Sequence, residues 1–388
     1  MNLLSLAQAQ YEQIVADRRY FHQNPELSGQ EEQTARYIQK ELSDLGFYVE
    51  EKVAGTGLVG HIETGKPGKS HLLRFDMDAL PIQEENDFPF RSKIDGIMHA
   101  CGHDGHMSIG LAIARILSEN KDEFSGSYHL IFQPAEETGT GAKAMVAAGV
   151  LERLQPDVVL GLHLWNEKPL GWLGVRPGPI MAGSARFEIV VNGKGGHGGR
   201  PQLTEDPIVA SAQLITQLQT IVSRNISPLE PAVLSVCSIE SGSAYNVIPS
   251  RVRLKGTMRF FDDAIFEKMK ERIAKNCEGI GLAQGCDITT NLEKLVEPTI
   301  NDVTIAEKAQ KAAKKLDKTI TVDAEYQTMI SEDVGVFFKD VPGCFVLVGA
   351  GESPNGNQYG HHHPKFDFDE RAMPLAAALL LETCLELG

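Results

Sequence analysis

Eight residues near the end of the first quarter of the chain carry much of its chemistry: His99-Ala100-Cys101-Gly102-His103-Asp104-Gly105-His106. They include one thiol, three imidazoles and one carboxylate, and the glycines let the backbone turn tightly around whatever these side chains bind. For any one of the histidines alone, a polar loop capping a helix that starts near Gly105 is the simpler interpretation. Four ligand-type side chains so close together, directly after an apolar stretch, favour a metal site instead. Further ligands are then expected from distant parts of the chain.

Length and composition predict two folded domains and exclude several classes of protein. The chain has 388 residues, of which 42% are hydrophobic, so it exceeds the usual size of a single core. Its six cysteines form no C-x-x-C pair, which argues against a disulfide framework and a structural zinc ribbon. A net charge of −15 disfavours binding to nucleic acid or anionic membranes. Residues 1–19 have no signal-peptide pattern, and no apolar run is long enough to span a membrane, so we expect a cytoplasmic protein.

Polar groups follow four apolar stretches that are typical of buried strands. The stretch 71–75 leads to Asp76 and Asp78, 128–132 leads to Glu136 and Glu137, and 158–162 leads to His163. The fourth, 344–348, leads through a glycine-rich loop to three consecutive histidines at 361–363. In an open α/β sheet, ligands bind beyond the carboxyl ends of the strands. The sequence therefore predicts one site assembled from four places.

The remaining elements indicate a small domain inserted into the first. Helices are expected over residues 3–22 and from a capping box at Ser28 and Glu31 to about Leu45. Between 184 and 296 the pattern becomes β-α-β-β-α-β, the order of a ferredoxin-like unit. Helices near 304–316 and 374–387 then return to the first domain. We predict an α/β fold with one domain of residues 1–183 and 297–388, and a second of residues 184–296.

These motifs resemble those of the di-metal metallopeptidase and amidohydrolase family that includes aminoacylases, carboxypeptidase G and succinyl-diaminopimelate desuccinylase. The resemblance is greatest to the branch with hippurate hydrolases and plant auxin-conjugate hydrolases. It is carried by residues 74–81, 98–106, 133–137, 161–165, 195–198 and 362–364, which span nearly the whole chain. The resemblance implies a mixed-sheet catalytic domain with helices on both faces, and a lid domain of the ferredoxin-like kind that also forms a homodimer.

The resemblance also implies roles for individual residues. The ligands of two divalent ions, Mn²⁺ or Zn²⁺ with Co²⁺ or Ni²⁺ as alternatives, would be Cys101, His103, Glu137, His163 and His362. In this branch a cysteine stands where relatives have a bridging carboxylate, and a thiolate is a softer ligand. Among His361, His362 and His363 we choose His362, because the branch usually shows His, one small or polar residue, then Pro.

The remaining roles concern catalysis and substrate binding. Glu136 would be the general base, and Asp78 would orient a ligand. His197 in its glycine-rich loop resembles the family histidine that reaches a neighbouring subunit's active site, and it would help to stabilise the oxyanion. Asn246 and Arg259 resemble the residues that hold the substrate carboxylate. Taken without the resemblance, these three are an ordinary loop histidine, a turn asparagine and an exposed strand arginine.

The predicted function is hydrolysis of the amide bond of N-acyl amino acids, hippurate-like or N-acetylated, to a carboxylic acid and a free amino acid. A dipeptidase and an N-acetyl-diaminopimelate deacetylase are alternatives within the same class. A catalytically silent dimer that binds metal or ligand is the alternative from another class. The sequence leaves open the acyl group, the amino acid and its chirality, the native metal, and whether tetramers form.

Overall fold

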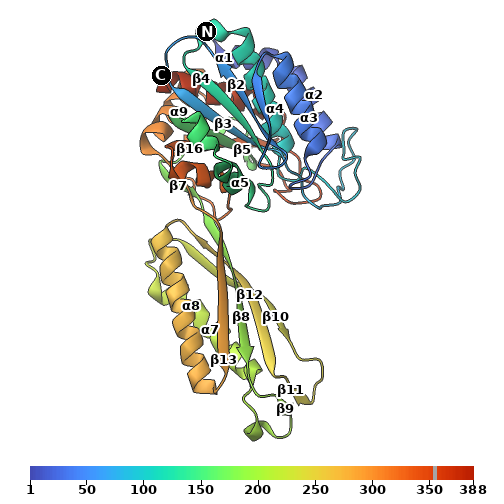
Figure 1. Ribbon diagram of the computed structural model, residues 1–388, viewed down its shortest axis with the longest axis vertical. Helices are drawn as coiled ribbons and strands as arrows, with labels where there is room; N and C mark the ends of the chain where they lie inside the picture. The colour runs from blue at the N-terminus through green and yellow to red at the C-terminus, as the bar shows by residue number, and fades with distance from the viewer. Residues whose placement is uncertain (353–355) are drawn as a thin grey trace. The chain divides into compact units, whose positions relative to one another are not determined.

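The computed structural model describes residues 1–352 and 356–388, which form two compact units. The first comprises Met1–Ile180, Thr299–Gln327 and Asp333–Gly388, and the second comprises Met181–Pro298 and Thr328–Glu332. Figure 1 labels the elements of both units. Each unit has its own apolar core.

A mixed sheet organises the first unit. Its strands are β1 (Tyr48–Val53), β2 (Gly57–Glu63), β3 (Ser70–Asp76), β4 (Ser127–Gln133), β5 (Val158–Pro169), β6 (Trp172–Gly174), β15 (Thr321–Asp323) and β16 (Gly343–Gly351). Among the described residues their order is β1-β2-β4-β3-β5-β16-β6-β15. The central strands β4, β3, β5 and β16 are mutually parallel, so their carboxyl ends share one edge of the sheet. Two further short strands, β7 (Gly178–Met181) and β14 (Thr299–Asn301), pair with each other.

Helices cover this sheet, most of them on one face. They are α1 (Leu3–Ala9), α2 (Tyr11–Gln23), α3 (Glu32–Asp44), α4 (His103–Glu119), α5 (Gly141–Ala147), α6 (Val150–Leu154), α9 (Val303–Leu316), α10 (Ala372–Leu387), and the short 3₁₀ helices η1 (Lys121–Glu123) and η4 (Asp333–Lys339). The long helices and alternate strand residues such as Leu160 and Leu162 share one large core. On the opposite face Gly161 leaves room for Phe345 and for Val334 of η4. Successive side chains of a strand point to opposite faces of the sheet. Since other elements pack against the side chains of each face, both faces of the sheet are buried.

Two predictions about the first helices are wrong in detail. The helix expected over 3–22 is interrupted at Gln10, which ends α1 and precedes α2. Ser28 and Glu31 do not form a capping box, because the Glu26 carboxylate accepts the free amides of Gln33 and Thr34 at the start of α3. Ser28 and Glu31 are thereby left to contact other loops.

The second unit has the predicted β-α-β-β-α-β order. Its elements are β8 (Gly183–Asn192), α7 (Pro207–Thr220), β10 (Ala232–Ser241), β12 (Arg251–Phe260), α8 (Asp263–Gln284) and β13 (Asp287–Val296). The sheet is antiparallel throughout, in the order β10-β12-β8-β13, and α7 and α8 share one core with it. A two-stranded antiparallel sheet of β9 (Gly196–His197) and β11 (Val247–Ile248), the 3₁₀ turn η2 (Pro201–Leu203) and the π-helical turn η3 (Ile221–Asn225) complete the unit. The helix α7 begins as expected, with Asp206 capping it and Pro207 in its first turn.

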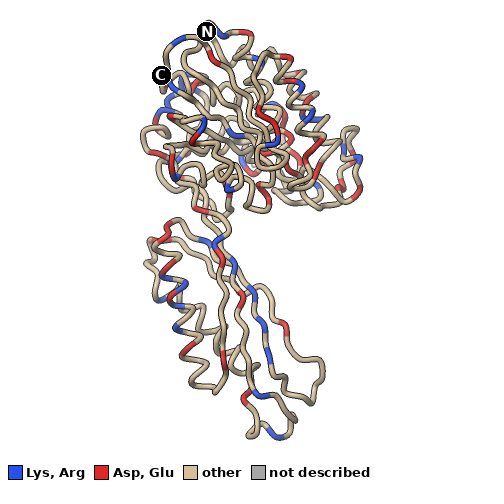
Figure 2. Tube along the Cα trace, in the orientation of Figure 1, with Lys and Arg blue, Asp and Glu red and all other residues tan. Residues whose placement is uncertain are grey.

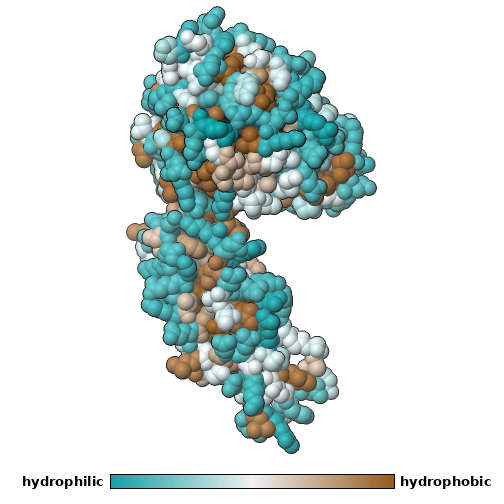
Figure 3. Space-filling model, viewed as in Figure 1, coloured by the Kyte–Doolittle hydropathy of each residue, from teal (hydrophilic) through white to brown (hydrophobic). Residues whose placement is uncertain are grey.

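Charged residues of both signs, and apolar residues, are spread over the surface of both units. Acidic and basic residues alternate over most of the trace, and β12 carries several Lys and Arg along its length (Figure 2). The visible surface of each unit is mostly hydrophilic, with scattered apolar residues (Figure 3). Within the described residues, no helix has the length and hydrophobicity that a bilayer crossing requires.

Candidate metal centre

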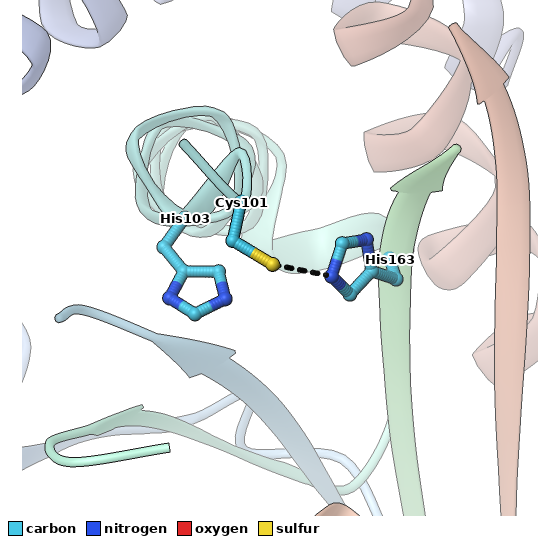
Figure 4. A group of neighbouring side chains, drawn as sticks. All are labelled: Cys101, His103 and His163. Carbon is cyan, nitrogen blue, oxygen red and sulfur yellow. Dashed lines mark hydrogen bonds between the residues drawn. The ribbon is translucent and has the colours of Figure 1, made fainter. Parts of the chain in front are cut away.

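The predicted ligands of the first unit lie together at the carboxyl edge of its parallel strands. Cys101 and His103 stand at the start of α4, where Gly102 adopts a left-handed conformation with φ of 89°. His163 comes from β5, and the Cys101 Sγ lies 3.5 Å from the His163 Nε2 (Figure 4). The strand continues through His163 instead of ending before it, but its pairing with β3 stops at Gly161. The imidazole lies level with Asp76, the last residue of β3, and so stands at the carboxyl end of the neighbouring strand, where ligands bind in an open α/β sheet.

Two groups of potential ligand atoms share the same thiol. One consists of Cys101, His103 and His163, and the other consists of Cys101, Glu137 and His362. Within each group the ligand atoms lie within 4.8 Å of one another, and the His362 Nε2 is 3.3 Å from the Glu137 Oε2. A third group joins His103 to both Glu136 and Glu137. The five predicted ligands and the predicted base are thus neighbours, with Cys101 common to the first two groups.

Hydrogen bonds fix the ring tautomers of the two buried histidines. The Nδ1 of His103 donates to the Asp78 carbonyl at 2.9 Å, and the Nδ1 of His163 donates to the Leu164 carbonyl at 2.8 Å. In the neutral ring each Nε2 is then left with the lone pair that could bind a cation. Metal-binding histidines are commonly oriented by such a bond from the opposite ring nitrogen.

The neighbouring histidines His106 and His361 are engaged elsewhere. The Nδ1 of His106 donates to Asp76 at 2.6 Å, and its Nε2 accepts the Leu164 amide at 3.0 Å. The Nε2 of His361 donates to the Leu164 carbonyl at 2.9 Å. Both nitrogens of His106 are therefore occupied, and its hydrogen bond to Asp76 explains the short distance between these two residues.

The backbone separates His362 from the histidines on either side. His362 has a left-handed φ of 66°, which is uncommon for a residue with a side chain, and its amide donates to the Ala100 carbonyl at 2.8 Å. This turn directs its ring toward Glu137, while His363 stacks on Tyr359. Among the three consecutive histidines, His362 is the one that reaches the predicted ligand groups.

The electrostatics of the site fit divalent cations. Burial lowers the pKa of His103, but Asp76, Asp78 and Glu137 outweigh it and raise that pKa to about 10. Burial and the nearby Glu137 and Glu136 carboxylates raise the pKa of the Cys101 thiol. A positive charge is therefore favoured at the His103 ring, and a bound cation would stabilise the thiolate.

Unpaired buried atoms support the same fit. The Nε2 of His103 and the Oε1 of Glu137 are buried and have no hydrogen-bond partner. Leaving such atoms unpaired costs free energy unless something binds them. A set of one thiol, three imidazoles and a carboxylate is chemically suited to a divalent transition metal such as Zn²⁺.

Asp78 orients the turn that carries the two glutamates. Its carboxylate accepts the amides of Glu136 and Glu137 at 3.1 and 3.0 Å, and also the Ser28 hydroxyl at 2.6 Å. Burial raises the pKa of Asp78, but hydrogen bonds from His103 and Ser28 outweigh it and lower that pKa below its usual range. Asp78 therefore remains an anion that fixes His103 through its carbonyl and the glutamate turn through its carboxylate.

Two buried networks that sequence reasoning missed surround the site. Arg74 donates to Asp76, Gln133 and Asp333 at 2.6 to 2.9 Å, and the Asp333 amide donates to the Glu136 Oε1 at 3.4 Å. Arg74, Asp76 and Gln133 lie inside the motifs given above, so the sequence indicates that they are near the site. It does not predict which residues they contact. Asp333 begins the short 3₁₀ helix η4, which the sequence does not predict, and no motif marks this residue.

The second network holds the start of α4. Arg18 donates to Asp104 and Asp367, and the His22 Nδ1 donates to Asp104 at 2.8 Å. Burial lowers the pKa of His22, but the hydrogen bonds to Asp104 and Glu84 outweigh it and raise that pKa. Asp104, the residue next to the predicted ligand His103, is thereby fixed from the N-terminal helix α2.

The other predicted site residues belong to the second unit. His197 and Asn246 are exposed and adjoin across the paired strands β9 and β11, where the Gly198 amide donates to the Asn246 carbonyl at 2.9 Å. Arg259 on β12 is half-buried, and it donates to the Thr257 hydroxyl and to the Met258 carbonyl. His197 and Asn246 thus lie together, whereas Arg259 belongs to a different strand, and their roles remain predictions.

Comparison with known proteins gives consistent results. The model of peptidase family M20/M25/M40 matches residues 72–386. An IAA-amino acid hydrolase ILR1-like 5 of Arabidopsis thaliana is 38% identical over 98% of this chain and 88% of its own. The N-acetylcysteine deacetylase of Bacillus subtilis is 38% identical over 95% of each chain.

A solved structure agrees over nearly the full length. The YXEP protein of Bacillus subtilis, described as a dinuclear metal binding peptidase, superposes with a TM-score of 0.85 at 33% identity, covering 97% of this chain and 98% of that one. These matches confirm the resemblance inferred from the motifs, the predicted α/β fold class and the predicted class of metal-dependent amidohydrolase. The chain belongs to peptidase family M20/M25/M40.

Proposed function

We propose that this protein hydrolyses N-acyl amino acids, with hippurate-like or N-acetylated amino acids as its substrate class. The observation that carries the proposal is the meeting of Cys101, His103, Glu137, His163 and His362 beside Glu136. The names of two relatives, an IAA-amino acid hydrolase and an N-acetylcysteine deacetylase, support an acylated amino acid as substrate.

The five ligands would hold two divalent ions, Mn²⁺ or Zn²⁺. His103 and His163 would bind one ion, Glu137 and His362 would bind the other, and the Cys101 thiolate would be shared. When bound, two such ions supply a water of lowered pKa, from ~15.7 toward ~7, and polarise the substrate carbonyl. The soft thiolate favours Zn²⁺ or Co²⁺ over harder ions.

Glu136 is the proposed proton carrier. Glu137 belongs to the group with Cys101 and His362, which leaves Glu136 as the carboxylate beside the place of attack. Glu136 would take a proton from the attacking water and return it to the leaving amine. The Asp78 carboxylate and the Asp333 amide support this orientation by bonding the Glu136 amide and Oε1.

Residues of the second unit would complete the site. His197 would stabilise the oxyanion of a neighbouring subunit's reaction. Asn246 and the guanidinium of Arg259 would hold the substrate carboxylate, which offsets the unfavourable net charge of the chain.

A homodimer formed through the second unit is part of this proposal. Its outer strand β10 pairs on one side only among the described strands, and exposed apolar side chains such as Leu229, Ile239 and Tyr245 lie near it in the sequence. An edge strand with unpaired backbone groups is a ready pairing surface for a second copy. Light scattering at micromolar concentration should therefore give twice the chain mass.

A peptide substrate is the second candidate, because the YXEP protein is described as a peptidase. A dipeptide presents the same free carboxylate to Arg259 but adds a charged amine near the scissile bond. Dipeptides and N-acetyl-diaminopimelate therefore belong in the same assay as the simple N-acyl amino acids.

The test is amino-acid release from N-acetyl, N-benzoyl and N-succinyl amino acids, in both chiral forms, and from dipeptides. The enzyme is depleted of metal and refilled with manganese, zinc or cobalt, and Glu136→Gln serves as the matched control. We expect metal-dependent release from one acyl class and none from the control. Release from dipeptides alone would replace the substrate class, and no release from any substrate would favour a silent binding protein.

A further inference from the structure

The turn that carries Glu136 and Glu137 is held by two buried carboxylates from other parts of the chain. Asp78 accepts the amides of Glu136 and Glu137. The amide immediately before them, that of Ala135, donates to the Glu31 Oε1 at 2.9 Å. Three consecutive amides of the turn therefore donate hydrogen bonds to two carboxylates. Of these two, Asp78 was predicted near the site and Glu31 was not.

Glu31 is fully buried, and both oxygens of its carboxylate accept hydrogen bonds. Its Oε1 also accepts the Gly29 amide at 2.9 Å, and its Oε2 accepts the Thr56 hydroxyl at 2.5 Å. A buried carboxylate is costly unless such donors satisfy it. The helix α3 does not account for its presence, because Glu31 precedes α3 without a side-chain capping bond and Glu26 supplies that cap.

The backbone that Glu31 holds is strained. Ala135 has a left-handed φ of 54°, which a residue with a side chain rarely adopts. Its carbonyl accepts the Gly141 amide at 3.1 Å and the Thr138 hydroxyl at 3.1 Å, so both polar groups of its backbone are bound. A strained residue directly before two functional side chains persists only when its surroundings impose it.

We propose that Glu31 is a positioning residue, which holds Ala135 in its left-handed conformation and so fixes the direction of Glu136 and Glu137. This inference rests on the proposed function for the roles of those two glutamates. Glu31 acts as a hydrogen-bond acceptor for two amides and one hydroxyl, and it touches neither substrate nor metal. Loss of the acceptor should loosen the turn, which weakens metal binding through Glu137 and turnover through Glu136.

The experiment compares Glu31→Ala with Glu31→Gln, which keeps an oxygen for the two amides and places an amide group opposite the Thr56 hydroxyl. The matched control is Glu382→Ala, which removes another buried carboxylate, one that pairs with Lys315 on α9. Three experiments are made on each variant: steady-state kinetics (kcat and KM) with the best N-acyl amino acid, affinity for Co²⁺ alone by the absorbance of its bond to a thiolate, and hydrogen exchange of the peptide containing Ala135.

We expect Glu31→Ala to weaken Co²⁺ binding and to lower kcat, each by about 10- to 100-fold, the usual effect of losing a residue that orients a ligand. Its KM should change little, and the Ala135 peptide should exchange faster. Glu31→Gln should stay close to wild type in all three measurements, and so should Glu382→Ala. Should Glu31→Ala fail to fold, Thr56→Val removes one donor and should lower Co²⁺ affinity by about 2- to 10-fold.

Several results would overturn the proposal. The first is unchanged Co²⁺ affinity and unchanged hydrogen exchange in Glu31→Ala. The second is a loss in Glu31→Gln as large as the loss in Glu31→Ala. The third is an equally large loss in the control Glu382→Ala. If only Thr56→Val can be purified, unchanged Co²⁺ affinity in that variant has the same meaning. A wild-type enzyme that releases no amino acid would refute the proposed function, yet Co²⁺ affinity and exchange would still decide the role of Glu31.

Discussion

His103 and His163 of the first unit differ sharply from His197 of the second in how the fold holds their side chains. In the first unit, His103 and His163 are 0% and 5% exposed, and a hydrogen bond fixes each ring. In the second unit, His197 is exposed, and its side chain accepts the nearby Gly199 amide at 2.9 Å. Metal ligands must be held in place before the ion arrives, whereas a substrate-binding residue can be ordered by the substrate. Variants in the first unit should therefore affect metal and chemistry, and variants in the second should spare the metal.

The largest expected effect separates the two adjacent glutamates. Glu136→Gln should lower kcat by about 10²–10⁴-fold with metal content unchanged, because it removes the proton carrier only. Glu137→Gln should lose metal instead, because it removes a ligand. Metal analysis and kcat on the same samples check this. Near-normal turnover in Glu136→Gln would show that another group carries the proton.

The next effect tests whether the second unit contributes to chemistry. His197→Ala should lower kcat by about 10²–10³-fold through loss of an oxyanion donor, with full metal content. Because His197 is expected to act on a neighbouring subunit, mixing His197→Ala with Glu136→Gln should restore roughly a quarter of wild-type activity, since half of the dimers are mixed and each has one intact site. No recovery after subunit exchange would place His197 in its own subunit's site or outside catalysis.

A smaller effect is expected at the substrate carboxylate. Arg259→Ala should lower kcat/KM by about 10- to 100-fold, mainly through KM, because charged hydrogen bonds to the substrate are lost. Arg186→Ala is a matched control on the neighbouring strand β8, since Arg186 forms an exposed ion pair with Glu293 and should be silent. Equal KM values for wild type and Arg259→Ala would remove Arg259 from the carboxylate site.

The smallest effect concerns stability in the first unit, away from the proposed ligands. Burial lowers the pKa of His71 to about 4, and its ring stacks on Tyr128. The unfolded chain, with a pKa near 6.5, binds the proton first, so stability falls as the pH drops from about 6.5 toward 4. His71→Phe keeps the stacking on Tyr128. The free energy of unfolding of this variant should fall by about 2 kcal/mol less than that of wild type between pH 7 and pH 5. Urea unfolding at both pH values measures it, and an unchanged pH dependence would contradict the assignment.

Much of the fold followed from the sequence because the buried strands are continuous apolar runs with polar residues at one end. The same pattern brought Glu136, Glu137 and His163 to one edge of the sheet. The capping prediction at Ser28 and Glu31 failed, because spacing alone does not reveal that Glu26 competes for the helix amides. Asp333 and Arg18 were not predictable either, since their partners lie 86 to 352 positions away in the chain and only the folded protein brings them together.

The most direct test of the account is a titration of metal-free enzyme with Mn²⁺ or Zn²⁺, with bound metal and turnover of an N-acyl amino acid measured on the same sample. The account predicts no turnover without metal and a rise that levels off at two ions per subunit. Turnover by the metal-free enzyme, or full metal binding without any turnover of N-acyl amino acids or dipeptides, would contradict a metal-dependent amidohydrolase.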